Sequence, residues 1–274
     1  MSIEILTPRV AFITAIYGGY EKTCKAFTPQ NIPCDFICFT DNPEIETNGW
    51  TLDTNPYHFT HPSPIDTGEY LNSLKNNAHS RNVGKFYKLN FYNIPRLADY
   101  DLIIWVDGTI KIIHENCAAY FLKTLKADEP IALWENEMLD GSMLTELKIS
   151  LKDERFSSTR FFDQAQPFQD LQKQYDTYIS EGYTDAFWKV INPSLHYGFW
   201  CAAFVGFNMR SHKIRAFLDR WYLQILMHST KDQMGLSYAL WKENIIPYTL
   251  PDHAVKGGVH SVTDFHIKGK KHGE

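Results

Sequence analysis

The residue with the clearest chemical potential is Asp107, because it directly follows an apolar run, residues 102–106 (Leu-Ile-Ile-Trp-Val). Such a run is typical of a strand that is buried on both faces of a parallel sheet. Ligands of open α/β sheets bind beyond the carboxyl ends of these strands, and a carboxylate there can bind a divalent cation or a ribose hydroxyl group. The alternative is that Asp107 caps a turn with Gly108, before a second short strand over residues 110–113.

Two further apolar runs end in a similar way. Residues 10–16 are followed by a Tyr-Gly-Gly-Tyr segment, residues 17–20, and residues 36–40 are followed by Asp41. The paired glycines permit a tight turn close to a ligand. No third glycine opens a helix, so this is not a dinucleotide-binding fingerprint. One parallel sheet with its ligand along the carboxyl edge explains all three strand ends.

Three cations precede the strand that ends at Asp107. Arg81, Lys85 and Lys88 lie near the middle and end of a helix predicted over residues 69–92, which Pro95 stops. Cations in this place can bind a diphosphate. The alternative, a solvated helix face, is expected for at least one of the three.

The second half of the chain supplies another acidic candidate. Residues 195–207 alternate aromatic and small side chains, which suits a sheet floor that a ligand approaches closely. A helix is predicted from residue 214, where apolar side chains recur at i, i+3, i+4 and i+7. The next helix opens at Asp232 and Gln233. Asp232 is therefore either a functional acid or the N-cap of this helix.

Two glutamates follow another predicted strand, residues 131–134. Glu135 and Glu137 are candidates for a general base at the end of that strand. The charged, amphipathic stretch from 139 to 182 predicts a helical insertion that packs over the sheet, and a last strand is expected over residues 245–250.

Composition limits the classes of function. Of 274 residues, 44% are hydrophobic and 22% are charged, which is ordinary for a globular protein with a large core. With a net charge of −5 and no dense basic stripe, we expect no nucleic-acid partner. Five cysteines without zinc-site spacing predict reduced thiols. We expect one compact α/β domain over residues 1–274. Because no signal peptide or membrane-spanning run is apparent, we expect the protein in the cytoplasm.

Taken together, these elements resemble a GT-A glycosyltransferase, whose Rossmann-like, mostly parallel central sheet is flanked by helices and binds a nucleotide sugar. Three stretches of the chain resemble the family that includes glycogenin and bacterial galactosyltransferases. The first stretch is Lys88-Leu89 before the strand that ends in Asp107-Gly-Thr109, and the second is the small-residue strand 201–208 with the later Asp232-Gln233 pair. The third, His266-x-x-Gly269-x-Lys271, approximates the family's His-x-x-Gly-x-x-Lys. The resemblance is closer still to the glycosyltransferase-like family DUF616. Proteins of that family share a strand that ends in Trp-Val-Asp-Gly, an aromatic Gly-x-Trp stretch and a Lys-Asp-Gln motif.

The resemblance implies transfer of a sugar from a nucleoside diphosphate donor, with UDP expected, to a hydroxyl group of a glycan or glycolipid. Residues 9–135 would form the nucleotide-binding half and residues 190–274 the half that binds sugar and acceptor. Asp41 would contact the base or ribose, and the two tyrosines of the glycine turn would face the base. The residues implied in donor binding are Tyr17, Gly18, Tyr20, Asp41, Arg81, Lys85, Lys88, Asp107, Gly108, Thr109 and Lys271.

One departure from the family pattern concerns a metal ion. GT-A enzymes usually carry Asp-x-Asp, whose last acid binds Mn²⁺ or Mg²⁺, but the third position here is Thr109. Asp107, with the Thr109 hydroxyl, His266 and the nucleotide, would form a weak metal site. The alternative is that the lysines and Arg81 neutralise the diphosphate without a metal. Of the two, the resemblance favours the metal.

The resemblance also assigns catalytic roles. Asp232 would touch the transferred sugar or, in an inverting enzyme, act as base on the acceptor hydroxyl. Gln233 would contact the polar edge of the sugar, and Glu135 or Glu137 would be the alternative base.

Three other functions compete with this one. A metal-dependent, ceramidase-like hydrolase could use an Asp/His metal site to activate water. A sugar nucleotidyltransferase would need a glycine-rich, lysine-bearing phosphate loop near the first strand, which the sequence lacks. A carbohydrate-binding protein that kept the fold and lost catalysis would explain Thr109. Fold alone does not decide among them.

Overall fold

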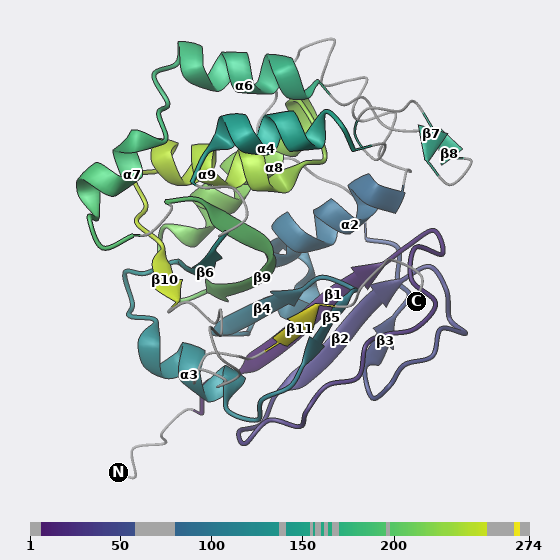
Figure 1. Ribbon diagram of the computed structural model, residues 1–274. Coiled ribbons are helices and arrows are strands. Elements are labelled where there is room, and N and C mark those ends of the chain that lie inside the picture. Colours follow the sequence, from purple (N-terminus) through teal and green to yellow (C-terminus); the bar gives the residue numbers. More distant parts are fainter. Residues whose placement is uncertain are drawn as a thin grey trace, which may run out of the picture.

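A seven-stranded sheet forms the centre of the protein (Figure 1). The computed structural model describes residues 7–57, 80–136, 141–153, 156, 160–161, 164–165, 170–195, 198–250 and 266–268. The strand order is β10-β6-β9-β4-β1-β2-β3, and β9 alone runs antiparallel to its neighbours in this sheet. The strands are β1 (Val10–Ile16), β2 (Asp35–Thr40), β3 (Thr51–Asp53), β4 (Leu102–Val106), β6 (Ile131–Glu135), β9 (Trp200–Asn208) and β10 (Tyr248–Leu250).

The mixed α/β architecture with a mostly parallel sheet is confirmed. Both halves of the chain contribute strands to this one sheet, because β9 and β10 join the strands of the first 135 residues. All five residues of β4 are buried, as expected for a strand that is covered on both faces.

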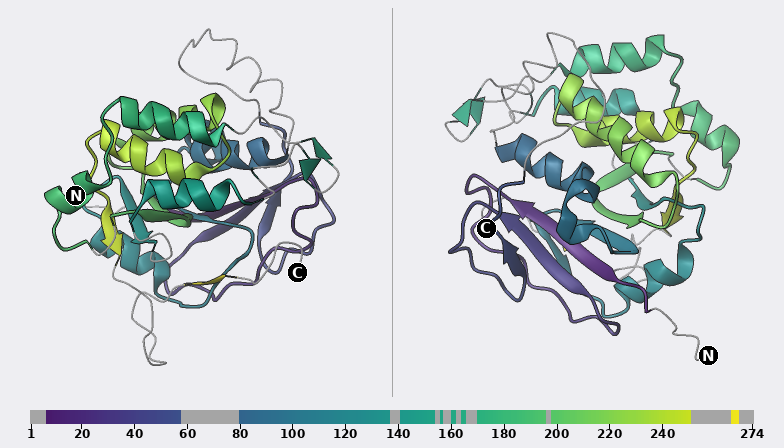
Figure 2. Two further views of the ribbon diagram at one scale, coloured as in Figure 1. Left: turned by 45° about the horizontal axis from the view of Figure 1, so that its top comes forward. Right: turned by 180° about the vertical axis from the view of Figure 1, so that it is seen from behind.

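Alternate residues of the strands face two separate cores. Ile13 and Trp105 belong to the core under α2 (Ser80–Leu89), α8 (Ile214–Met227) and α9 (Asp232–Lys242). Phe12 and Ile104 belong to the core on the other face, under α3 (Cys117–Thr124). Figures 1 and 2 show these two layers, with the small sheet of β5 (Ile110–Ile112) and β11 (His266–Lys268) on the side of α3.

The helical insertion packs on α9 and not directly over the sheet as predicted. Met143 and Tyr178, from α4 (Met143–Ser150) and α6 (Leu171–Ser180), form a third apolar cluster with Met234 and Tyr238 of α9. Since α9 is buried along most of its length, it lies between the sheet layer and the insertion. The remaining elements of this region are β7 (Arg160–Phe161), β8 (Gln164–Ala165) and α7 (Ala186–Ile191).

Two other expectations differ in detail. The helix predicted to Tyr92 ends at Leu89 and is followed by two short 3₁₀ helices, η1 (Phe91–Asn93) and η2 (Pro95–Leu97). Pro95 begins η2 instead of ending α2, because the first helical position needs no backbone N–H. The part of the predicted helix before residue 80 lies outside the described residues. In the described part of the chain, no helix has both the length and the apolar character needed to cross a membrane.

Candidate functional site

Three predicted residues follow the carboxyl ends of three neighbouring strands. The strands β4, β1 and β2 are adjacent and parallel in the sheet. Asp107, Tyr17 and Asp41 come directly after them. The three strand ends therefore meet at one edge of the sheet, which is where an open α/β sheet binds its ligand.

The turn after β1 is fixed to the end of β2. Gly18 and Gly19 have φ angles of 65° and 67°, and Tyr20 N donates to Tyr17 O at 3.4 Å. Two consecutive residues with positive φ are the requirement of a type I′ turn, which glycine meets without strain. Gly18 N also donates to both carboxylate oxygens of Asp41, at 3.2 and 3.0 Å. The exposed Asp41 is thus part of this turn.

Tyr17 packs against the helix side of the sheet. Its ring stacks on that of Tyr87, with the ring centroids 5.2 Å apart, and Tyr87 stacks on Phe39 in turn. Burial and a hydrogen bond with Tyr87 raise the pKa of Tyr17. Tyr20 is half-buried. Tyr17 is therefore held by packing at the carboxyl edge of the sheet, and its phenol group stays neutral at physiological pH.

Lys88 joins the two acids predicted on separate halves of the chain. Its Nζ donates to Asp232 Oδ2 at 2.5 Å and to the carbonyl oxygen of Ala202 at 2.5 Å. The same Nζ lies 3.7 Å from Asp107 Oδ1. The Lys88 side chain is only 1% exposed, whereas that of Asp107 is 35% exposed. One buried ammonium group thus connects β4, β9 and α9.

Lys85 lies one turn earlier on α2 and reaches the same acid. Its Nζ lies 2.7 Å from Asp232 Oδ2, and its side chain is 22% exposed. Residues three apart share one helix face, which is why both lysines meet Asp232. Of the two ammonium groups, that of Lys85 is the more accessible to a ligand. The N-cap position of α9 is occupied by Lys231, and Asp232 is the first helical residue, so the N-cap alternative for Asp232 is wrong.

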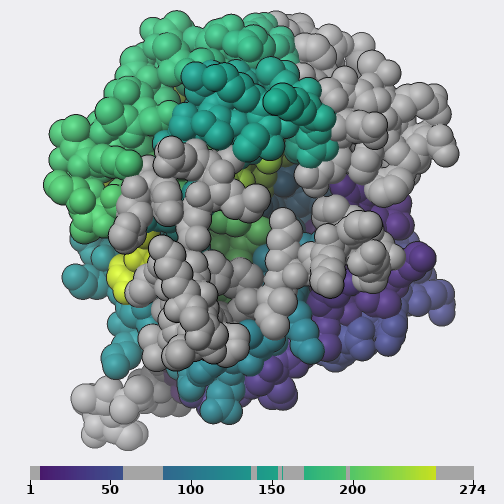
Figure 3. Space-filling view, viewed as in Figure 1, coloured from purple at the N-terminus to yellow at the C-terminus, as the bar shows by residue number. Residues whose placement is uncertain are grey.

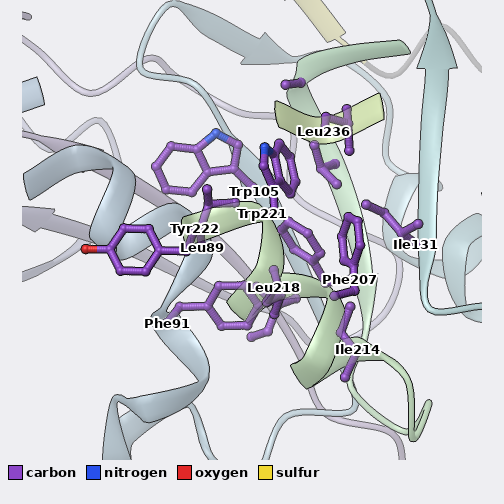
Figure 4. Packing of buried hydrophobic residues seen from close by; sticks show 14 of the residues in the cluster. Leu89, Phe91, Trp105, Ile131, Phe207, Ile214, Leu218, Trp221, Tyr222 and Leu236 are labelled. Carbon is purple, nitrogen blue, oxygen red and sulfur yellow. The ribbon is translucent and has the colours of Figure 1, made fainter. Parts of the chain in front are cut away.

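Two tryptophans orient the acids. Trp105 Nε1 donates to Asp107 Oδ1 at 2.6 Å, and Trp221 Nε1 donates to the backbone oxygen of Asp232 at 2.8 Å. Lys88 Nζ lies 5.4 and 5.8 Å from the centroids of these rings, within the range of cation–π attraction. Figure 4 shows the two indoles side by side. Trp105 was not predicted as a site residue, although a residue two positions before Asp107 on a strand shares its face.

The mutual charges set the protonation states. Burial alone would raise the pKa of Asp232, but the ammonium groups of Lys85 and Lys88 outweigh burial and hold it well below its usual range. Burial alone would lower the pKa of Lys88, but Asp232 and Asp107 raise it. Burial lowers the pKa of Lys85, and Asp232 only partly opposes this. Asp232 is therefore ionised at neutral pH, and Lys88 is charged.

Gln233 adds an unsatisfied group beside Asp232. Its Nε2 atom is buried and has no hydrogen-bond partner among the described residues. A buried donor without a partner costs about 1–3 kcal/mol, and a ligand is one explanation for such a group. In the space-filling view of Figure 3, surface coloured as α9, α2 and β9 is visible in a hollow below α4.

The turn before Asp232 is held by the helical insertion. Lys231 forms an ion pair with the buried Glu146 of α4. Ser229 Oγ donates to Gln174 Oε1 of α6 at 2.5 Å, and both residues are fully buried. No local sequence pattern predicts these contacts, because they join segments that are distant along the chain.

Glu135 lies apart from the lysine cluster. It ends β6, opposite Trp200 of β9, and its Oε1 accepts a hydrogen bond from Gly198 N at 2.6 Å. Because β9 lies between β6 and β4, Glu135 is two strands from Asp107. Neighbouring strands are about 4.8 Å apart, so the separation across the sheet is about 10 Å. Glu137 lies outside the described residues.

The remaining residues that were predicted to bind the donor or a metal lie in the turn after β4, on β11, on α2 or outside the described residues. Thr109 is buried, and a Cβ atom added at Gly108 would lie 3.2 Å from Glu21 Cγ. His266 pairs with Ile112 on β5, so its backbone is further along β5 from Asp107 than that of Lys268, which pairs with Ile110. The backbone of Arg81 belongs to α2, and Lys271 lies outside the described residues.

The chain matches no protein-family model and no curated protein sequence. Among solved structures, its fold is similar to the apo form of the bifunctional glycosyltransferase WbbM (10% identity, TM-score 0.46, 92% of this chain and 40% of WbbM). It is also similar to the Mn/GDP form of core-mannan synthase A from Aspergillus fumigatus (11%, 0.42, 88% and 71%). A third is apo mouse xyloside xylosyltransferase 1 (7%, 0.43, 89% and 84%). The chain thus spans less than half the length of WbbM.

Proposed function

We propose that this chain is a GT-A glycosyltransferase that moves a sugar from a nucleoside diphosphate donor, with UDP expected, to a hydroxyl group of a glycan or glycolipid. The observation that carries the proposal is the contact of Lys88 with both Asp107 and Asp232, beside Lys85, at the carboxyl edge of the sheet. The resemblance to DUF616 supports the same reading.

The two lysines suit the chemistry of the leaving group. When the bond between sugar and diphosphate breaks, negative charge develops on the leaving phosphate. Preorganised cations in a water-poor site stabilise that charge more strongly than water does. Asp232 and Asp107 keep Lys88 charged and hold it in place. Lys85 is the more exposed ammonium group, and we assign to it the direct contact with the diphosphate.

The nucleoside is assigned to the other strand ends. Asp107 has a partly exposed carboxylate beyond β4, which suits a ribose hydroxyl group. Asp41 lies two strands away, beyond β2, and is assigned to the base or ribose. Tyr20, next to the turn that Asp41 holds, offers a ring to the base.

Asp232 is better suited to positioning than to proton transfer. A general base acts best when its pKa is near the working pH, whereas the lysines hold the pKa of Asp232 far lower. We therefore assign Asp232, with the unpartnered amide of Gln233, to the transferred sugar. Glu135 is the base assigned to the acceptor hydroxyl if the enzyme inverts the configuration of the sugar.

A metal ion is not accommodated by the described residues alone. They contain no group of three or more His, Cys, Asp and Glu side chains that could hold one. Near Asp107 the other acid, Asp232, is already paired with two ammonium groups. Binding of Mn²⁺ or Mg²⁺ by Asp107 and His266 would need further ligands from the nucleotide.

Thermal-shift measurements with UDP, GDP and CMP test the proposal. A ligand at 100 times its Kd stabilises a protein by about 2.7 kcal/mol, so the nucleotide of the donor should raise Tm by several degrees. A hydrolase or a carbohydrate-binding protein without catalysis would be stabilised by none of the three.

A further inference from the structure

A cavity of about 760 Å³ lies along the edge strand β10, away from the lysine cluster. Its walls come from the connection between α9 and β10, the segment after α7, and both ends of β6. Small-molecule sites have volumes of about 300–1,000 Å³, so the cavity is large enough for an extended ligand. Figure 1 shows β10 at the edge of the sheet, close to α7.

The cavity leads along the sheet toward the candidate active site. Since β10 runs parallel to β6, Leu250 is level with Trp134, and Glu135 follows at the carboxyl edge. Pro130 and Lys213 line the opposite end. A ligand that fills the cavity would therefore have one end at Glu135, about 10 Å across the sheet from the strand that ends at Asp107.

The charges of the lining disfavour an anion. Three carboxylates, those of Asp128, Glu129 and Glu135, face one ammonium group, that of Lys213, among the described lining residues. A phosphate or an acidic peptide would meet net repulsion there. A second nucleotide is disfavoured for the same reason.

The neutral lining groups favour a polyhydroxylated ligand. The lining includes Asn192, Ser194, Asn244 and Thr249 together with Tyr248 and the aliphatic side chains of the α9–β10 connection. Sugar hydroxyl groups donate to carboxylates and accept from amides and hydroxyls, while the apolar faces of sugar rings pack on aromatic and aliphatic side chains. Ser194 Oγ donates to Asn192 Oδ1, and Thr249 Oγ1 accepts from Trp200 Nε1. These groups keep further hydrogen-bonding capacity, which a purely apolar ligand would bury without a partner.

A peptide strand added to β10 is the other class of ligand for such an edge. Strand addition relies on a row of backbone hydrogen bonds. In the described part of the chain, this edge offers the three residues of β10, and Pro247 precedes them. Short edges and prolines are features that oppose strand addition, so a peptide fits less well than a glycan.

We propose that this cavity, the β10 groove, binds a neutral oligosaccharide, and that this is the acceptor chain of the reaction proposed above. The second part rests on the proposed function, because it places the reactive end of the glycan at Glu135. The first part, carbohydrate binding, does not depend on it.

Calorimetric titration with maltohexaose, cellohexaose, mannohexaose and xylohexaose tests the groove directly. Ile246 lines the groove and is 52% exposed, so Ile246→Trp should fill it without disturbing the core. The matched control is Val190→Trp, because Val190 is 77% exposed on α7 and does not line the groove. We expect at least one hexasaccharide to bind, Ile246→Trp to weaken binding tenfold or more, and Val190→Trp to leave it unchanged.

Three results would overturn the inference. They are no binding of any hexasaccharide to the wild-type chain, equal effects of the two tryptophan variants, and binding of an alternating Thr-Val octapeptide that Ile246→Trp abolishes. The thermal-shift measurements with UDP, GDP and CMP separate failure of this inference from failure of the proposed function. Hexasaccharide binding without nucleotide binding would retain the groove and reject the transferase, and the reverse would reject only the groove.

Discussion

The ammonium group of Lys88 and the carboxylate of Asp232 lie 2.5 Å apart, although they belong to different halves of the chain. Lys88 is fully enclosed, and its second acid, Asp107, is exposed enough to meet a ligand. A change at any one of these three residues therefore alters the charge balance of the whole cluster, which makes the account testable by substitution.

Asp107→Asn should remove activity and leave the fold intact. Asp107 ends a strand and its side chain is 35% exposed, so its loss opens no cavity, and the amide still accepts the hydrogen bond of Trp105. If Asp107 holds the donor, turnover should fall by about 100-fold or more. Turnover with donor and acceptor, measured beside Tm, checks this. Unchanged turnover in a folded variant would remove Asp107 from the site.

Asp232→Asn should lower stability as well as turnover. Among the described residues, it leaves the buried Lys88 with Asp107 as its remaining acidic partner, and loss of one partner of a buried ion pair costs about 3–5 kcal/mol. Nucleotide affinity should stay within a few-fold, because Asp232 is assigned to the sugar and to the transition state. Chemical denaturation and calorimetry measure the two quantities.

A double variant separates stability from catalysis. Lys88→Met with Asp232→Asn removes the buried charge together with its partner, so it should be more stable than Asp232→Asn alone without recovering turnover. Equal stability of the wild-type chain and Asp232→Asn would mean that the ion pair contributes nothing to the fold.

The stability that Asp232 contributes should depend on pH in one direction. The folded-state pKa of Asp232 is lowered, and an aspartate in an unfolded chain has a pKa of about 3.9. The contribution is therefore fully present above about pH 4 and is lost as the pH falls below that value. The difference in unfolding free energy between the wild-type chain and Asp232→Asn should be constant from pH 7 to about pH 4.5 and shrink below pH 4. A difference that shrinks already between pH 7 and 5 would contradict the lowered pKa.

Chelation distinguishes the two ways of neutralising the diphosphate. If Lys85 and Lys88 supply the charge, nucleotide affinity in EDTA should remain within about threefold of its value with Mn²⁺. Loss of binding in EDTA that Mn²⁺ restores would instead assign the charge to a cation at Asp107, and His266→Ala would then weaken the restoring effect.

The sequence predicted which strand ends form the carboxyl edge of the sheet, but it did not predict which side chains pair with one another there. Buried apolar runs that end at Tyr17, Asp41 and Asp107 identify the strands, and one strand direction brings their ends together. Lys85 and Lys88 share a helix face by their spacing alone. Their pairing with Asp232 is a tertiary contact that no local pattern encodes.

Glu135 shows where sequence order misleads. β6 follows β4 and β5 along the chain, yet the antiparallel β9 separates β6 from β4 in the sheet. The glutamate therefore lies beside the β10 groove and not beside Asp107. The insertion likewise packs on α9 because Met234 and Tyr238 form an apolar face there, and this contact joins segments that are distant along the chain.

The most direct test of the central claim is calorimetric titration of UDP, GDP and CMP into the wild-type chain, Lys85→Gln and Lys123→Gln. Lys85→Gln removes the more exposed ammonium group and leaves Lys88 paired with Asp232, so the fold should persist. Lys123 is exposed on α3, on the opposite face of the sheet. One nucleotide should bind the wild-type chain. Lys85→Gln should bind it about tenfold more weakly, which is a loss of about 1.4 kcal/mol in binding free energy. Lys123→Gln should bind it as tightly as the wild-type chain does. Binding of no nucleotide, or equal binding by Lys85→Gln, would contradict that claim.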